Sequence, residues 1–160
     1  MRYVLDTNVF LEANKRYYGL DFCPVFWEWL RDHENKGNLY SIRSVYDELK
    51  DFGDELADWV KQYSYYFHSE SDNACQENFK IIANLCQRKY NLGHKKNINF
   101  LGSADPWLIA RAMTDGSTVV TEERYKLQGE KILIPNICHE LGVDYINTFE
   151  LLREFDDCFK

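Results

Sequence analysis

The sequence predicts an α/β protein in which helices cover both faces of a mostly parallel sheet. Short apolar runs of strand length alternate with longer segments of helical periodicity along the whole chain, which is the pattern of parallel sheets. Residue types that begin helices follow several of these runs directly. A length of 160 residues fits one domain, so we expect residues 1–160 to form a single unit.

Six short runs are expected to form the strands. They are mainly apolar and are bounded by polar or turn-forming residues, as buried strands are. In chain order they are residues 2–5, 39–42, 65–67, 117–121, 131–134 and 144–146.

The helices are placed by the residues that begin them. Pro24 suits a first helical turn, whereas Ser44 and Ser103 are of a type that caps helix N-termini. Residues 91–102 read as a polar loop. The first expected helix follows Asp6-Thr7-Asn8, and the second covers about 24–32. A third begins near 45 and breaks at Gly53, and a fourth covers 56–63. The others run from 71 or 72 to about 90, from Ser103 onward, and over 148–155 at the end of the chain.

Composition excludes several classes of protein. No apolar stretch approaches the roughly 20 residues that span a bilayer, so we expect no membrane span and a cytoplasmic protein. The five cysteines form no C-x-x-C pair and the four histidines are scattered, which argues against a disulfide framework and a zinc site. The net charge of −7 gives nucleic acid no attraction from the mean field. Residues 76–100 are the exception, with five basic residues against one acid.

Four segments each place an acid at one edge of the predicted sheet. Asp6 follows the first strand, and Glu122 and Glu123 follow the strand at 117–121. Glu48 lies at the edge of the apolar face of its helix, and Asp105 begins the stripe that faces the sheet. Clustered carboxylates repel one another unless a cation joins them. The oxygen donors favour Mg²⁺ or Mn²⁺, which can polarise a phosphoryl oxygen.

Each acid taken alone also has a structural explanation. Asp6 could cap the helix that follows it, and Glu48 could interact with its helix dipole. Asp105-Pro106 and Glu122-Glu123 could be helix-start signals. The occurrence of all four in this order favours the metal site.

Four motifs in this order resemble the PIN-domain nucleases, the group that includes VapC-type toxins. Tyr-Val-Leu-Asp-Thr-Asn (3–8) is similar to their opening signature, and Glu48 within Ser-Val-Tyr-Asp-Glu-Leu to their second acid. Residues 104–112, Ala-Asp-Pro-Trp-Leu-Ile-Ala-Arg-Ala, resemble the helix of the third acid. Val-Val-Thr-Glu-Glu (119–123) resembles the strand that ends in Thr-x-Asp. The resemblance covers residues 2–147 and is closest to a small uncharacterised PIN-like subfamily.

This resemblance implies a three-layer α/β/α fold and Mg²⁺- or Mn²⁺-dependent cleavage of RNA, leaving 5′-phosphate and 3′-hydroxyl ends. Asn8 and Thr121 would position carboxylates or water. The fourth position departs from the family, because a glutamate replaces the usual aspartate; either Glu123 or its neighbour Glu122 would fill it. The implied metal ligands are Asp6, Glu48, Asp105 and Glu123 (or Glu122).

The resemblance also implies partners. The chain would be the toxin of a toxin–antitoxin pair, with an antitoxin protein, such as one of helix-turn-helix type, as its partner. Many relatives dimerise, so a homodimer is a further candidate. RNA would follow the basic segment before Asp105, where Tyr90 and Phe100 could stack on bases. The residues expected to bind the RNA backbone are Arg88, Lys89, Lys95 and Lys96.

Two alternatives belong to other classes. A Mg²⁺-dependent phosphatase of the haloacid-dehalogenase type also begins with a strand and an aspartate, but it needs a second aspartate where this chain has Asn8. A catalytically silent PIN-like module would instead bind a protein, using Phe26, Trp27 and Trp29 as an exposed surface. Binding of Mn²⁺ that depends on Asp6 would separate the nuclease from the silent module.

Overall fold

The computed structural model describes residues 1–160 and contains one five-stranded sheet. The strand order is β3-β2-β1-β4-β5, and all four neighbouring pairs are parallel. The sheet is therefore wholly parallel, where the sequence predicted a mostly parallel one. The strands are β1 (Tyr3–Leu5), β2 (Leu39–Ile42), β3 (Phe67–His68), β4 (Thr118–Val120) and β5 (Tyr145–Ile146).

The three central strands are buried along their whole length. Tyr3 of β1 pairs with Leu39 of β2 on one side and with Thr118 of β4 on the other. A parallel sheet covered on both faces favours such short, mainly apolar runs, which is why these strands could be located from the sequence.

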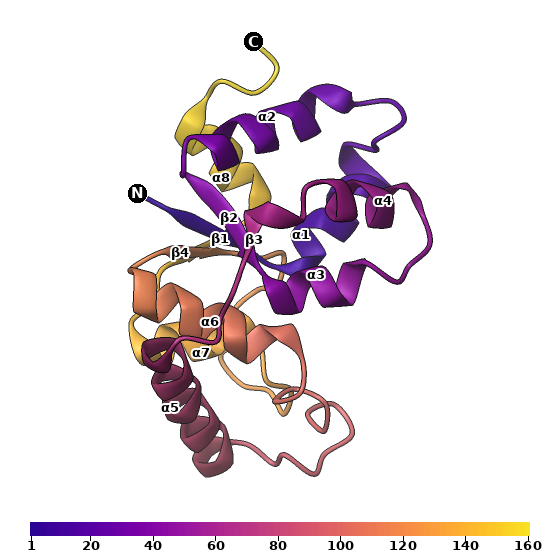
Figure 1. Cartoon of the computed structure of the whole chain (residues 1–160). Helices are drawn as coiled ribbons and strands as arrows, with labels where there is room; N and C mark the ends of the chain where they lie inside the picture. The colour runs from indigo at the N-terminus through magenta and orange to yellow at the C-terminus, as the bar shows by residue number, and fades with distance from the viewer.

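Helices cover both faces of the sheet and make a three-layer α/β/α fold (Figure 1). One face carries α1, α2, α4 and α8, and the other carries α6 and α7, with α5 packed on α6 (Figure 1). A π-helical turn, η1 (Ala13–Tyr17), continues α1. The helices are α1 (Thr7–Glu12), α2 (Pro24–Asn35), α3 (Arg43–Leu49), α4 (Glu55–Gln62), α5 (Asn73–Lys89), α6 (Ala104–Asp115), α7 (Ile134–Leu141) and α8 (Thr148–Phe155).

Capping residues begin several helices as predicted. The Ser103 hydroxyl accepts a hydrogen bond from the Asp105 N–H at 3.3 Å, and the Asp72 carboxylate accepts one from the Cys75 N–H. Ser44 does not cap α3, because the helix already begins at Arg43 and the Ser44 hydroxyl donates to Glu70.

The predicted strand at 131–134 is wrong. Its last residue, Ile134, begins α7 instead. Pro135 lies in the first turn, and Gly142 ends the helix with a φ of 69°, a left-handed conformation that suits glycine. Near the other edge of the sheet, residues 64–66 form a 3₁₀ turn, and β3 begins only at Phe67.

The aromatic residues of α2 are core residues and form no exposed surface. Phe26, Trp27 and Trp29 are 1%, 2% and 6% exposed. The Trp27 indole donates to the Tyr18 carbonyl, and the Trp29 indole donates to Asp157 of the C-terminal tail. The expected docking surface on α2 is therefore absent. No helix is long and apolar enough to cross a membrane.

Candidate acidic site at the carboxyl ends of the strands

The first acid, Asp6, follows β1 and is only 1% exposed. Its main-chain N–H donates to the Val120 carbonyl at 3.0 Å, which fixes it beside the end of β4. The Thr121 hydroxyl donates to Asp6 Oδ2 at 3.0 Å and accepts from the Glu123 N–H at 3.1 Å. The Asp6 carboxylate does not cap α1. Thr121 therefore links the acids that follow β1 and β4.

Glu48 on α3 is held by two donors from other helices. The Thr7 hydroxyl of α1 donates to Oε1 at 2.7 Å, and the Ala104 N–H of α6 donates to Oε2 at 3.0 Å. Both carboxylate oxygens therefore have fixed directions. Thr7 was not predicted from the sequence as a site residue; its position between Asp6 and Asn8 was the available signal.

The residues that follow β4 have different surroundings. The Glu122 carboxylate accepts hydrogen bonds from the N–H and the hydroxyl of Thr148, at the start of α8. Glu123 instead faces the other acids, because its charge acts on both Asp6 and Asp105. The structure therefore places Glu123, and not Glu122, beside Asp6 and Asp105. We call Asp6, Glu48, Asp105 and Glu123 the acid cluster.

Burial raises the pKa of three members of the acid cluster, and repulsion by neighbouring acids adds to the rise for Asp6 and Asp105. Burial and then the charges of Asp105 and Glu123 raise the pKa of Asp6 well above its usual range. Burial and then the charges of Glu123 and Glu48 raise the pKa of Asp105 to about 7. Burial also raises the pKa of Glu123. Charges that influence one another in this way lie close together, so four segments of the chain meet here.

The donor chemistry of the acid cluster fits a hard divalent cation. All the ligating groups are carboxylates, which Mg²⁺ and Mn²⁺ prefer. None of the four forms an ion pair with Lys, Arg or His. As the side chains lie, no group of three or more His, Cys, Asp or Glu residues is arranged to hold a metal ion. Binding would therefore require these carboxylates to turn toward a common point.

One lysine near the acid cluster was not identified from the sequence. Lys131 is exposed, and its charge lowers the pKa of both Asp105 and Glu123. It lies in the segment that was predicted to be a strand. Asn8 is exposed, and its side chain forms no hydrogen bond with the acid cluster. Thr7 and Thr121 provide the side-chain hydrogen bonds to the cluster.

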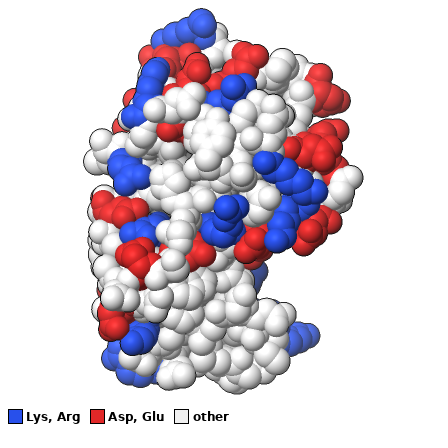
Figure 2. Space-filling model, in the orientation of Figure 1, with Lys and Arg blue, Asp and Glu red and all other residues white.

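Two of the four predicted RNA-binding residues already interact with other groups of the chain. Lys89 pairs with Glu140, and the Arg88 guanidinium donates to the Asn84 carbonyl. Lys95 and Lys96 are exposed and form no ion pair. On the face that Figure 2 shows, positive and negative side chains are interspersed and no continuous basic stripe appears.

Phe100 is not available to stack on bases. It is 7% exposed and belongs to the hydrophobic core, which Tyr90 also contacts.

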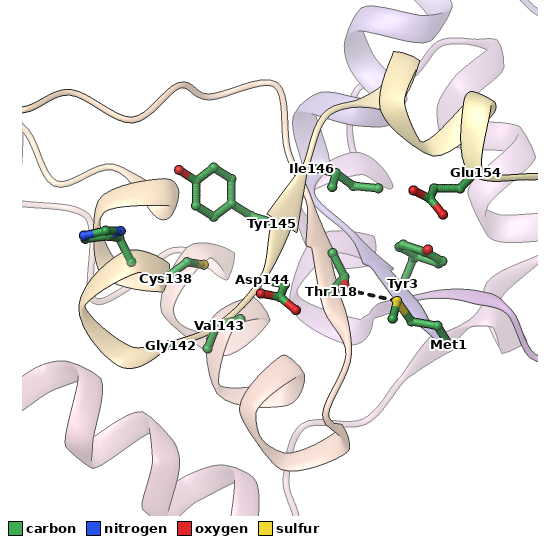
Figure 3. Close-up of a pocket in the computed structure, with 11 residues that line it drawn as sticks. Met1, Tyr3, Thr118, Cys138, Gly142, Val143, Asp144, Tyr145, Ile146 and Glu154 are labelled. Carbon is green, nitrogen blue, oxygen red and sulfur yellow. Dashed lines mark hydrogen bonds between the residues drawn. The ribbon is translucent and has the colours of Figure 1, made fainter.

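The largest surface cavity lies away from the acid cluster. It has a volume of about 520 Å³, and Figure 3 shows Tyr3, Thr118 and Asp144 among its lining residues. These residues belong to the amino-terminal ends of the strands, whereas the acid cluster lies at the carboxyl ends. A smaller cavity of about 240 Å³ contains Thr121 and Glu123 in its wall.

Comparisons with known proteins agree with this architecture. The family described as "Domain of unknown function (DUF4411)" matches residues 3–159. No curated protein sequence matches the chain.

The solved structures that resemble the chain share its fold at low sequence identity. VapBC2 from Rickettsia felis, bound to a DNA fragment from its promoter, is 12% identical with a TM-score of 0.57. VapBC-1 from nontypeable Haemophilus influenzae is 15% identical with a TM-score of 0.55, and FitAcB from Neisseria gonorrhoeae is 13% identical with a TM-score of 0.54. Each match covers 92% of this chain and 98% of the other. The fold is therefore the PIN-domain, VapC-like fold.

Proposed function

The chain belongs to the DUF4411 family, and we propose that it is a metal-dependent endoribonuclease that acts as the toxin of a toxin–antitoxin pair. One observation carries the proposal: four carboxylates from four segments meet at the carboxyl ends of parallel strands without a basic ion-pair partner. Parallel α/β sheets bind ligands at this edge. A cluster of buried carboxyl groups without an ion-pair partner is costly to keep unless it serves a function.

Asp6, Asp105 and Glu123 would hold the cation, with Glu48 beside them. Mg²⁺ or Mn²⁺ bound there would polarise a phosphoryl oxygen and make water more acidic. The chain contributes orientation: Thr121 holds Asp6, and Thr7 holds Glu48. This arrangement needs no histidine base.

The proposed substrate is RNA, which would approach along the loop that leads into α6. Lys95 and Lys96 are the free cations of this loop, and Lys131 offers a third one next to the acids. Arg88 and Lys89 stand farther along the same segment with their charges partly engaged. The single-stranded backbone would thus meet positive side chains immediately before it meets the acid cluster.

The proposed partner is an antitoxin protein. Two of the similar structures are VapBC complexes and the third is FitAcB, and the Rickettsia felis complex is bound to promoter DNA. A helix-turn-helix antitoxin would give this chain the same link to DNA. A homodimer is the second proposed assembly, and sedimentation of the purified chain at several concentrations tests it.

The decisive experiment is cleavage of total RNA by the purified chain with Mn²⁺. We expect the wild type to cut and the Asp105→Asn variant to be inactive. Asp58→Asn is the matched control, because Asp58 is an exposed acid of α4 outside the site. Cleavage by Asp105→Asn at the wild-type rate would refute the proposal, as would an inactive wild type with a correctly folded chain.

A further inference from the structure

The smaller cavity opens directly beside the acid cluster and is lined by exposed aromatic rings. Thr121 and Glu123 form part of its wall, so it adjoins the proposed catalytic site at Glu123. Tyr17, Tyr125 and Phe149 also line it and are 46%, 39% and 41% exposed. An apolar ring costs free energy when it faces water, and three such rings around one hollow mark a binding surface.

The backbone places Tyr17 at this cavity by an unusual turn. α1 continues into η1, and the Tyr18 N–H donates to the Ala13 carbonyl at 2.6 Å, five residues earlier. Turns of this π type are rare and occur often at functional sites. The Tyr17 ring meets the Phe149 ring edge to face, with 5.3 Å between their centroids. Segments from α1 and α8, far apart in the sequence, thus share one aromatic wall.

Two polar groups at the cavity have unused hydrogen-bonding capacity. The Asn147 side-chain oxygen accepts from the Glu150 N–H, which directs the amide nitrogen elsewhere, and that nitrogen has no partner within the chain. Arg124 also lines the cavity, is exposed and forms no ion pair. An amide donor suits the edge of a nucleobase, and a guanidinium suits a phosphate.

We propose that this cavity is a nucleobase-binding subsite, in which one unpaired base of the RNA substrate packs against the wall of Tyr17 and Phe149, face to face with one ring and edge-on to the other, beside the bond to be cut. The inference rests on the proposed ribonuclease function, and it adds the site that fixes the position of the substrate. Aromatic stacking tolerates every base because each has a π-face. The Asn147 amide then contacts the base edge, while Arg124 holds a neighbouring phosphate.

Binding of single-stranded RNA hexamers tests the subsite separately from catalysis. The probes are fluorescein-labelled hexamers of mixed sequence: one carries all six bases, and each of six others has a single abasic position. Binding is titrated by fluorescence anisotropy in Ca²⁺, and gels verify that the RNA is not cleaved. Tyr17→Ala and Phe149→Ala should each weaken binding of the intact hexamer by roughly 5- to 150-fold, the equivalent of about 1–3 kcal/mol of stacking. On one abasic hexamer, the same substitutions should have no effect.

The controls keep the test specific. Phe52→Ala removes an aromatic ring that is 55% exposed and lies outside the cavity, and it should leave binding unchanged. Tyr17→Phe keeps the ring and should restore binding. Thermal melting should show all of these exposed-site variants to be folded.

Four results would overturn the subsite. Three of them concern RNA: equal binding by wild type and both alanine variants, equal losses on every abasic hexamer, or no binding of any hexamer by the wild type. Weaker binding to a protein partner with unchanged RNA binding would assign the cavity to that partner and likewise reject it. Cleavage of total RNA by the wild type decides the proposed function independently, so a failure of the subsite and a failure of the proposed function can be told apart.

Discussion

At the scale of single residues, the acid cluster is a place where stability and proposed function conflict. Burial and the charges of its neighbours Glu123 and Glu48 disfavour the ionised form of Asp105, which is why its pKa rises to about 7. A carboxyl group with a raised pKa binds more protons in the folded than in the unfolded chain. The stability that this proton binding gives the folded chain is therefore fully present below the unfolded pKa of 3.8. It is lost as the pH rises through the folded pKa of about 7.

Asp105→Asn should therefore stabilise the metal-free protein at pH 7.5. We expect a gain on the order of 1–3 kcal/mol over the wild type that shrinks toward zero at pH 4.5. Urea unfolding in EDTA at the two pH values measures it. The exposed-acid control Asp58→Asn should show no such change. Identical pH dependence in Asp105→Asn and the wild type would mean that Asp105 carries no raised pKa.

Substitutions of the two glutamates after β4, Glu122 and Glu123, should have different effects on cleavage and stability. Glu123→Gln should lower RNA cleavage at least 10-fold, since it removes a charge from the acid cluster. Glu122→Gln should mainly lower the melting temperature, because the Glu122 carboxylate holds the start of α8 through Thr148. Cleavage rates and melting curves of both variants check this. The reverse order of cleavage would place Glu122 in the site.

At the scale of elements, the start of α6 matters most, because it carries Asp105. Ser103→Ala removes the hydroxyl that accepts from the Asp105 N–H. The loss of an N-cap should cost about 1 kcal/mol. It should also reduce cleavage, since the first turn of α6 then holds Asp105 less firmly.

The matched control is the N-cap of a helix outside the site. The Asp54 carboxylate accepts from the Ala57 N–H at 2.9 Å at the start of α4. Asp54→Ala should cost similar stability but leave the cleavage rate unchanged. Equal loss of cleavage in the two variants would show that activity follows global stability and not the position of Asp105.

The elements that could be predicted from the sequence were those with a strong local signal. β1 is an unbroken apolar run, β2 is interrupted only by Ser41, and α6 has Ser103 as its cap. α7 was missed because Lys-Ile-Leu-Ile (131–134) resembles a strand over four residues. Its helical signal lies farther on, in the spacing of Ile134, Ile137, Cys138 and Leu141 and in the following Gly142.

The acid cluster could be placed from the sequence, but its hydrogen bonds could not. Parallel strands bring their carboxyl ends to one edge, so the motifs predict Asp6 near Glu122 or Glu123. The choice between Glu122 and Glu123 depends on Thr148, which is 26 residues away from Glu122. Burial of the α2 aromatics likewise depends on the C-terminal tail, where Asp157 accepts from Trp29. Contacts between distant segments leave no local pattern.

At the scale of the whole molecule, the negative net charge of the chain opposes binding of the proposed RNA substrate. A chain with a net charge of −7 repels RNA through its mean field. Attraction must therefore come from a local group of cations, and the loop before α6 supplies Lys95 and Lys96, which no acid neutralises. Lys89 contributes less, since it pairs with Glu140.

Lys95→Glu combined with Lys96→Glu should weaken binding of single-stranded RNA and reduce its dependence on salt. Each lost phosphate contact lowers the slope of log K against log salt by about 0.7 for single strands. The double variant should therefore flatten the slope by about 1.4 if both lysines contact phosphate. Mn²⁺ affinity should stay nearly unchanged, because the acid cluster is not altered.

Lys36→Glu with Lys61→Glu is the matched control: it imposes the same change in net charge at lysines on other elements, so a purely global charge effect would flatten both slopes equally. An unchanged slope in the Lys95/Lys96 variant would move the RNA contact to another surface.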